Sequence, residues 1–491
     1  MNLRDLHCIV IGAGIGGLAA AALLARRGVQ VTVLEARHYP GGCAATFTSA
    51  KYRFDSGATV GCGFHSNGPL DRLGKELDII WPVHSEPVAW QYRHGNLRLD
   101  LLPNRENIIT RFPRSKTFWD EQARLARILW RLSAEGLPWP VSGLRDVAGV
   151  AGRALASLPD SVRLLPFARR SALEWLASHG LDSDPDFVRF IDAQLLISVQ
   201  TTSRHANALS VAIALDLPVA GTWRVEGGIG SIAQQLAESI GRDGGTVLYS
   251  KKVIRIDSIQ REVLGVETSD GDALAADVVV ANLTPESLEV LDDSGMAGKQ
   301  DAPTSGWSAF MLYLGVDLSV FEHAGADHLQ IVATEGELGE GRSLFVSASP
   351  AGEAGRAPEG ERAVTISTHT NAASWFDTLH QSREQYEYLK NEYTERALHL
   401  LFEQLPEARG AVRSVTAATP LSWEFWTGRR WGHVGGYPQT SLFGVRGAAT
   451  KYNNLFLVGD LIFPGQSLPG VVTGARRTVE LLLRRASKLG R

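Results

Sequence analysis

The amino-terminal part of the chain alternates short apolar runs with glycine-rich breaks. Residues 6–11 are rich in Ile and Val, which predicts a buried parallel strand. Residues 18–27 are mostly Ala and Leu and end in two arginines, with Gly28 just beyond, which is typical of a helix and its end. Residues 29–34 predict a second buried strand. Together these segments predict a β-α-β unit of about thirty residues.

The rest of the chain divides into a helical part and strand-rich parts. Residues 81–102 alternate as strands do, residues 119–180 have a helical pattern, and residues 227–241 and 381–405 each predict a helix. Buried strands are predicted at residues 247–257, 263–268, 277–281 and 455–458, the last followed by a helix from about residue 471. A mostly antiparallel sheet is predicted from four short strands without helices between them, at residues 308–316, 329–333, 344–349 and 363–368.

Length and charge limit the classes of protein to which the chain can belong. Its 491 residues exceed one compact core and predict two or three structural units. Basic and acidic residues nearly cancel, 49 against 53, which argues against a nucleic-acid partner, because such proteins usually carry a basic excess. Three cysteines are too few for a disulfide framework and fit a reducing compartment, so we expect a cytoplasmic protein.

The longest uncharged apolar run covers residues 8–25. It is shorter than the ~20 apolar residues that a spanning helix needs, and glycines interrupt it. No basic segment precedes it and no clear cleavage site follows it, which argues against a signal peptide. We therefore expect any membrane contact to be peripheral.

Residues 12–17 match the pattern G-x-G-x-x-G at Gly12, Gly14 and Gly17. In such a loop the first glycine allows a tight turn, the second lets the backbone approach a pyrophosphate, and the third lets helix and strand pack closely. Glu35 ends the second strand, where a carboxylate accepts hydrogen bonds from ribose hydroxyls. A glycine-rich core turn beside a surface Glu is the alternative, but the strand-turn-helix context favours a dinucleotide site.

A second glycine turn follows the same strand. Arg37 and the pair Gly41-Gly42 come directly after Glu35. Because glycine carries no side chain, this turn lets the backbone pass the pyrophosphate from the other side. Cys43, next in the chain, is a candidate redox thiol or covalent flavin anchor, although a small residue packed beside the pyrophosphate is the expectation we favour.

The carboxyl-terminal part carries a third block. An apolar strand ends in Gly459-Asp460, and we expect Asp460 near a ribityl chain or pyrophosphate. The following helix is predicted to open with Gly470, Val471 and Val472, and its first amides would face a flavin ring and stabilise the reduced, anionic form. Each block alone fits a structural loop, but their occurrence at both ends of the chain favours a flavin dinucleotide.

These blocks resemble the flavin-dependent phytoene desaturase and carotenoid isomerase family, within the amine-oxidase-like flavoproteins. The resemblance covers most of the chain and rests on residues 10–18, 33–36, 40–44, 52–58, 458–460 and 463–471. It is closest to bacterial carotenoid 3',4'-desaturases, and Cys43 stands where many phytoene desaturases have Arg. By this resemblance the backbone of Val253 contacts the adenine of FAD. No second G-x-G-x-x-G follows a buried strand, so a separate nicotinamide domain is not expected.

The resemblance implies an α/β fold with a Rossmann-type FAD-binding domain and a substrate domain that mixes a sheet with helices. The FAD-binding domain is expected from residues 1–85, 225–300 and 420–491, and the substrate domain from residues 86–224 and 301–419. The implied function is desaturation of a carotenoid at the C-3',4' bond, with FAD as cofactor and oxygen or a quinone as electron acceptor. A carotenoid cis-trans isomerase that uses reduced FAD is the alternative.

Two further readings concern partners. Some members of the wider fold bind prenylated GTPases without catalysis, but the intact phosphate turn and Glu35 argue against that class, since a pure binder need not hold FAD. Residues 111–172 carry eleven basic and five acidic residues together with Trp119, Trp130 and Trp139. That region fits a solvated helical lid or a peripheral contact with an anionic membrane on its inner face, and we favour the membrane, in which a polyene dissolves.

Other candidate residues carry weaker signals. No His-x-x-x-His or Cys-x-x-Cys pair occurs, so no metal site is expected. His65 is more often structural than catalytic in such a context, and we assign no catalytic base from the sequence. An aromatic group before the last strand fits a substrate tunnel and a core patch equally well; it consists of Trp423, Trp426, Trp431 and Tyr437.

Overall fold

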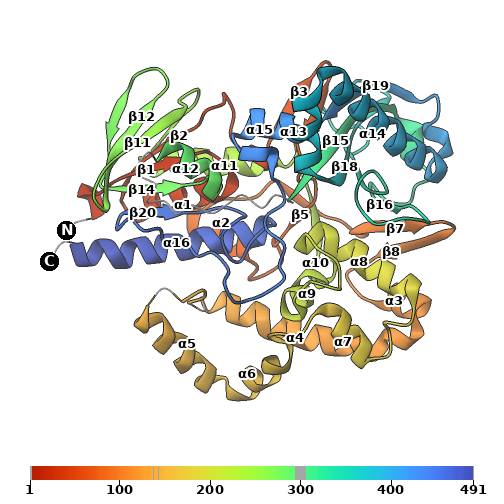
Figure 1. Cartoon of the computed structure of the whole chain (residues 1–491), viewed down its shortest axis with the longest axis horizontal. Helices are drawn as coiled ribbons and strands as arrows, with labels where there is room; N and C mark the ends of the chain where they lie inside the picture. Colours follow the sequence, from red (N-terminus) through yellow and green to blue (C-terminus); the bar gives the residue numbers. More distant parts are fainter. Residues whose placement is uncertain (1–2, 137, 142, 293–305, 490–491) are drawn as a thin grey trace.

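The computed structural model describes residues 3–136, 138–141, 143–292 and 306–489. Two main sheets lie at opposite sides of the upper half of the molecule, and a helical region extends below them (Figure 1). The fold is α/β, as the sequence predicts, and the predicted boundary between residues 300 and 301 lies outside the described residues.

A five-stranded parallel sheet forms the first unit, in the order β10-β2-β1-β14-β20. Its strands are β10 (Thr246–Leu248), β2 (Gln30–Leu34), β1 (His7–Ile11), β14 (Val278–Ala281) and β20 (Leu455–Leu457). The side chains of β1 alternate: Cys8 and Val10 pack against helices, whereas Ile9 and Ile11 pack against a small antiparallel sheet. Both faces are therefore buried, which explains why β1 is apolar from Cys8 to Ile11.

Three helices cover one face of this sheet: α1 (Ile15–Arg26), α11 (Gly230–Arg242) and α16 (Leu468–Leu489). The other face carries β11 (Val253–Ile259), β12 (Glu262–Thr268) and β13 (Ala273–Ala275). The predicted strand over residues 247–257 is wrong, because the chain turns at Ser250, whose φ of 56° is left-handed, and enters a different sheet. The last helix begins at Leu468, slightly before the predicted start.

A seven-stranded sheet forms the second unit, in the order β19-β15-β18-β17-β16-β7-β8. It is antiparallel except where β16 pairs with β7, so the predicted mostly antiparallel sheet is confirmed. The strands are β7 (Trp90–His94), β8 (Leu97–Leu101), β15 (Trp307–Asp317), β16 (His328–Val332), β17 (Ser343–Ala348), β18 (Glu361–Asn371) and β19 (Val412–Ala418). One face packs on α13 (Ala372–Gln381) and α14 (Arg383–Gln404). The sequence pattern did not predict α13.

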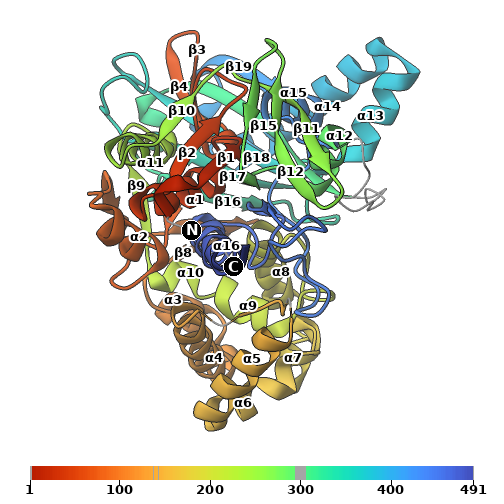
Figure 2. The ribbon, with the colours of Figure 1, turned by 90° about the vertical axis from the view of Figure 1, so that its left-hand side faces the viewer.

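Helices dominate the region between β8 and the second half of the chain, as predicted. They include α4 (Lys116–Ala134), α5 (Leu144–Ala156), α6 (Leu158–Leu164), α7 (Ala172–Ser178), α8 (Pro185–Val199), α9 (Ala208–Ala214) and α10 (Leu217–Ala220). Figure 2 shows α4 to α7 at the end of the molecule remote from the hairpin of β11 and β12. Among the described helices, none is both long and apolar enough to cross a bilayer.

The parallel sheet draws every strand from the segments expected for the FAD-binding domain, and the seven-stranded sheet draws every strand from those expected for the substrate domain. Short two- and three-stranded sheets join the units; one of them pairs β9 (Thr222–Val225) with β5 (Gly61–Cys62) and β6 (Val83–Ser85). The exact domain boundaries stay a prediction.

Candidate functional site

Three parallel strands end at one edge of a large cavity. The loop after β1 contributes Gly12 and Gly14, β14 is followed by Asn282, and β20 leads to Gly459. A Cβ at Gly14 would lie 2.4 Å from Asn282 Nδ2, and one at Gly459 would lie 3.2 Å from Asn282 Oδ1. Asn282 therefore fills the space between the two glycine loops. Sequence reasoning missed it, although its place at the carboxyl end of a parallel strand was an available signal.

The first turn of α1 presents free backbone amides to this cavity. Its N-cap, Gly14, has no side chain to cap the helix, and Ala13 N–H is already donated to Glu35. Gly12 has a φ of 91°, so the sharp turn needs glycine. Gly17 lies below the turn, where a Cβ would be 2.3 Å from the Gly12 carbonyl oxygen. Gly17 therefore serves packing, while Gly12 and Gly14 line the cavity.

Glu35 follows β2 and lines the cavity beside this turn. Its Oε2 accepts from Ala13 N–H at 2.7 Å and its Oε1 accepts from Arg37 N–H at 2.8 Å. Burial raises the pKa of Glu35, and these backbone hydrogen bonds oppose the rise. A carboxylate has about four acceptor positions, so each oxygen keeps one for another donor such as a ribose hydroxyl. Val253, at the start of β11, lines the same part of the cavity.

The second glycine turn lies against the first. Gly41 N–H donates to the Ala13 carbonyl at 2.8 Å, and a Cβ at Gly42 would lie 3.6 Å from the Gly14 Cα. Both Gly41 and Gly42 have positive φ and line the cavity. The Arg37 guanidinium lies over the Phe425 and Trp426 rings, at 4.7 and 4.8 Å from their centroids. The structure thus brings the two turns together on one wall.

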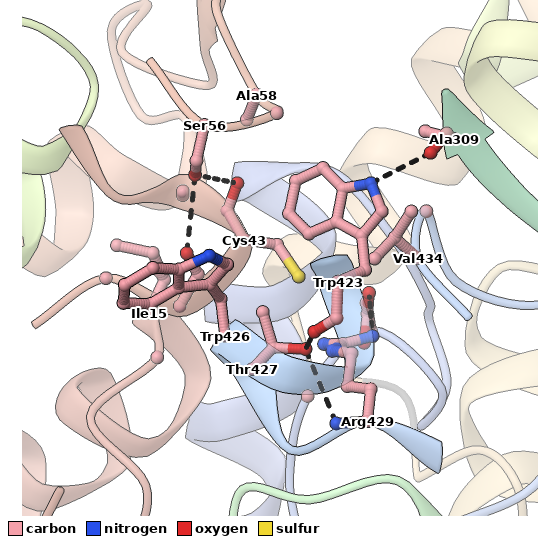
Figure 3. A pocket seen from close by; sticks show the side chains of 18 of the residues that line it. Ile15, Cys43, Ser56, Ala58, Ala309, Trp423, Trp426, Thr427, Arg429 and Val434 are labelled. Carbon is pink, nitrogen blue, oxygen red and sulfur yellow. Dashed lines mark hydrogen bonds and ion pairs between the residues drawn. The ribbon is translucent and has the colours of Figure 1, made fainter. Parts of the chain in front are cut away.

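Asp460 lines the cavity, but its carboxylate is already paired. Arg429 donates to both of its oxygens, at 2.8 and 3.0 Å. Burial acts to lower the pKa of Arg429, but Asp460 outweighs it and holds that pKa above its ordinary value. Burial also raises the pKa of the Cys43 thiol, against the opposing effect of Arg429. Cys43 is therefore a neutral thiol on the cavity wall, and Figure 3 shows it between the Trp423 and Trp426 rings in this view.

Of the three residues at the start of α16 that the sequence analysis assigned to the cofactor site, one lies next to the phosphate turn. Val471 lines the cavity, and its Cγ1 would lie 3.1 Å from a Cβ at Gly16. Val472 is buried in the core under the parallel sheet, and Gly470 packs beneath the Gly465 carbonyl. Neither of these two lines the cavity, because neighbouring residues of a helix point in different directions and Val471 is the one that faces the turn.

The aromatic group before the last strand divides between cavity and core. Trp423 and Trp426 line the cavity, and Trp423 Nε1 donates to the Ala309 carbonyl at 3.0 Å (Figure 3). Trp431 packs instead on Phe376, and Tyr437 is not among the lining residues. His65 also lies outside the lining. It is packed between the Trp130 and Trp223 rings, and burial lowers its pKa.

Asp55, within residues 52–58, holds distant parts of the chain together through its carboxylate. The sequence alone did not predict this role. Its Oδ1 accepts from Thr46 Oγ1 at 2.7 Å and from Ile229 N–H at 2.9 Å, next to the start of α11. Arg356, from the loop between β17 and β18, donates to its Oδ2 at 3.0 Å. This buried ion pair ties the glycine-rich cofactor wall to the second sheet.

The cavity fits FAD by shape and by the chemistry of its donors. Its volume of about 1890 Å³ exceeds the ~300–1,000 Å³ of ordinary ligand pockets, which leaves room beside a dinucleotide. Uncapped helix amides and two side-chain-free turns form a cradle suited to a pyrophosphate. Glu35 lines the cavity with free acceptor positions for a ribose, and Val471 lines it next to the phosphate turn. The individual cofactor contacts stay predictions.

Replacing Glu35 with Ala is expected to weaken FAD binding roughly ten- to hundredfold, because a charged acceptor for the ribose is lost. The phosphate cradle stays intact, so binding persists at high FAD concentration. A titration of apoprotein with FAD, followed by flavin fluorescence, measures the change. Glu395→Ala, at an exposed position of α14, is the control. Equal affinity of Glu35→Ala and wild type would place the ribose elsewhere.

Comparison with known proteins assigns the chain to a family. A family model described as flavin containing amine oxidoreductase matches residues 15–483. Prolycopene isomerase 1 of an Oncidium hybrid cultivar is 27% identical over 519 residues, which cover 99% of this chain and 85% of that protein. Phytoene desaturase (lycopene-forming) of a Paracoccus species is 26% identical over 511 residues, which cover 97% of each.

Solved structures agree on the fold. An oxidoreductase from Methanosarcina mazei superposes with a TM-score of 0.65 at 21% identity, over 97% of this chain and all of that one. The amine-oxidase-like flavoprotein fold predicted from the sequence is thereby confirmed, and the match to the flavin-containing family model confirms FAD as the predicted cofactor. The chain belongs to the flavin-containing amine oxidoreductase family, and its relatives include enzymes named for carotenoid substrates.

Proposed function

We propose that this protein is an FAD-dependent carotenoid desaturase that acts at the C-3',4' bond and passes electrons to oxygen or a quinone. When bound, FAD would accept a hydride from a carbon beside the polyene, and a base or water would take up the proton. We also propose that Gly12, Gly14 and the turn at Gly41-Gly42 hold the pyrophosphate, and that Glu35 holds the ribose.

The observation that carries the proposal is the separation of charge within the cavity. Among the described lining residues, all the charged ones come from the segments assigned to FAD binding. The lining contributed by residues 86–224 and 306–419 holds two titratable groups, Tyr313 and His369. Burial lowers the pKa of His369 to about 4 and raises that of Tyr313, so both are neutral at pH 7. This half suits a hydrocarbon better than an amine, whose cation needs a partner.

The neutral half also has the right kinds of side chain for a polyene. Large apolar groups from both the helical region and the second sheet line it, namely Trp90, Ile197, Leu217, Met311, Tyr313 and Phe345. The protein's part in the reaction is then to position the polyene next to the cofactor and to exclude water from it. Within the described lining of this half, only His369 is a candidate proton acceptor, and it is uncharged.

A second candidate is a carotenoid cis-trans isomerase that needs reduced FAD. The 27% identity to a prolycopene isomerase over nearly the whole chain favours it, and the same neutral cavity would serve. The two activities differ in electron balance. A desaturase removes two hydrogens and needs an acceptor in each turnover, whereas an isomerase leaves the substrate's composition unchanged.

Product analysis is expected to separate these activities. FAD-loaded protein is incubated with candidate carotenoids in air, and in parallel without oxygen after reduction of the flavin. For a desaturase we expect a product that lacks two hydrogens and absorbs at longer wavelength, formed only with an acceptor, because conjugation lengthens. Gly14→Val protein is the cofactor-free control. A product of unchanged mass that forms only under reducing conditions would decide for the isomerase.

A further inference from the structure

Helix α5 exposes apolar side chains and buries an acidic one. Val147 and Leu155 are 50% and 72% exposed, whereas Asp146, the one buried side chain among those described in this helix, is 8% exposed. A surface helix of a water-soluble protein normally buries its apolar stripe and exposes its charges. Arg145 is exposed as well, so what sets α5 apart is that Val147 and Leu155 lack the protein cover that apolar side chains of a surface helix normally have.

The apolar outer surface continues into α6. Leu158 and Val162 are each 53% exposed and Leu165 is 70% exposed, and α6 buries none of its residues. These three residues follow the spacing i, i+4, i+7, which places them on one side of a helix. With Leu155 they form what we call the apolar stripe, composed of Leu155, Leu158, Val162 and Leu165. Single exposed apolar residues are ordinary, but four exposed ones this close together in the chain mark a contact surface.

Basic side chains gather beside α5, in the part of the helix that precedes the stripe. A second cavity of about 600 Å³ separates α5 from α16, and it is lined by Arg145, Arg153, Arg477, Arg484 and Arg485. Only Asp146 and Glu480 oppose them among the described lining residues. Arg145 is exposed, and no hydrogen bond or ion pair to it occurs in the described part of the chain. Cations therefore outnumber anions beside α5, and next to the stripe Asp160 is shared by two arginines, Arg131 and Arg163.

The two layers match the profile of a lipid interface. An interfacial helix buries its apolar face roughly 5–10 Å deep while its cations stay among the headgroups. The arginine cavity is lined by α5 residues from Arg145 to Arg153, and the stripe begins at the last turn of α5 and continues into α6, so both lie along one helical segment. Figures 1 and 2 both place α5 and α6 at the outer end of the molecule, away from both large sheets.

We propose that the apolar stripe docks on the surface of an anionic phospholipid bilayer, with the arginines around α5 facing the lipid phosphates. The contact needs neither FAD nor substrate; only its usefulness for fetching a polyene rests on the proposed function. Leu155, Leu158, Val162 and Leu165 enter the acyl boundary, and Arg145 lies at the level of the headgroups. The net charge of the whole protein is −4, so attraction comes from this local cluster rather than from the whole chain.

Vesicle flotation tests the contact without any enzymatic readout. FAD-loaded protein is mixed with vesicles of phosphatidylcholine containing 30% phosphatidylglycerol, or of phosphatidylcholine alone. We expect wild type to float with the anionic vesicles and at least about tenfold less with the neutral ones. Changing all four stripe residues to Ser should reduce binding at least about fiftyfold, since each loses the burial of an aliphatic side chain. Arg145→Gln should reduce it about fivefold.

A matched control uses exposed apolar residues elsewhere. Ile259 and Leu264 are 62% and 48% exposed on β11 and β12, and changing both to Ser should leave flotation unchanged. Bound FAD and the thermal midpoint of each variant report that the fold is intact. An environment-sensitive dye on Leu158→Cys should shift to the blue with anionic vesicles, whereas the same dye on Ile259→Cys should not.

Three results would overturn the proposal. Equal flotation of wild type and the stripe variant excludes the stripe, and equal binding to neutral vesicles excludes the role of the arginines. Dimerisation in size-exclusion chromatography that the stripe variant abolishes, without any vesicle binding, would assign the stripe to a second copy of the chain. None of these results depends on which carotenoid reaction the protein catalyses.

Discussion

Protein with Gly14→Val is expected to purify without FAD, and its dissociation constant for added FAD should rise at least about a hundredfold. Gly14 has φ −71° and ψ 165°, which any residue can adopt, so backbone strain is not the reason. Space is the reason. A Cβ there would lie 2.4 Å from Asn282 Nδ2, and the Gly42 turn faces the same gap. Flavin absorbance after purification and a titration with FAD measure the loss.

A second variant separates two causes of that loss. Asn282→Ala removes the side chain that a Cβ at Gly14 would meet. If the clash with Asn282 were the whole effect, the double variant Gly14→Val, Asn282→Ala would bind FAD normally. We expect it to stay without FAD, because the pyrophosphate needs the gap itself. Gly241→Ala, at a helix position where a Cβ meets nothing within 4 Å, is the control. Full FAD content in the double variant would refute this placement of the phosphates.

Replacing Asp55 with Asn is expected to destabilise the protein by about 3–5 kcal/mol, because it leaves the buried Arg356 charge without a partner. The two side chains are only 11% and 6% exposed. At an unfolding entropy of ~2.1 cal/mol/K per residue, this corresponds to a fall in the thermal midpoint of roughly 3–5 °C. Differential scanning calorimetry measures it.

The partner variants show whether the charge pair is the cause. Arg356→Leu should also destabilise, since Asp55 then keeps only Thr46 and Ile229 as donors. Combining Asp55→Asn with Arg356→Leu should cost less than the sum of the single changes, because neither charge is left alone. The exposed pair of Arg383 and Glu387 supplies the control, and Arg383→Ala should not move the midpoint. Strictly additive effects would show that the two residues act independently.

Much of the cofactor wall could be predicted from the chain because its determinants are local. The strand-turn-helix at the amino terminus follows from apolar periodicity over a few residues and from glycines that tolerate a tight turn. Glu35 lies on the cavity because it ends the neighbouring parallel strand. The break at Ser250 went unpredicted, because a left-handed turn inside an apolar run leaves little local trace.

The sequence by itself determined the cofactor class and the turn that faces it, since neighbouring residues alone shape a β-α-β unit. Tertiary structure alone decided which distant residues meet there. Asn282 lies beside Gly14. Arg429 donates hydrogen bonds to the Asp460 carboxylate, which the sequence analysis had placed near the cofactor. Tertiary structure also decided that the charged lining residues come from the FAD-binding segments and that apolar side chains of α5 are exposed. Such contacts join positions far apart in the chain, where periodicity carries no information.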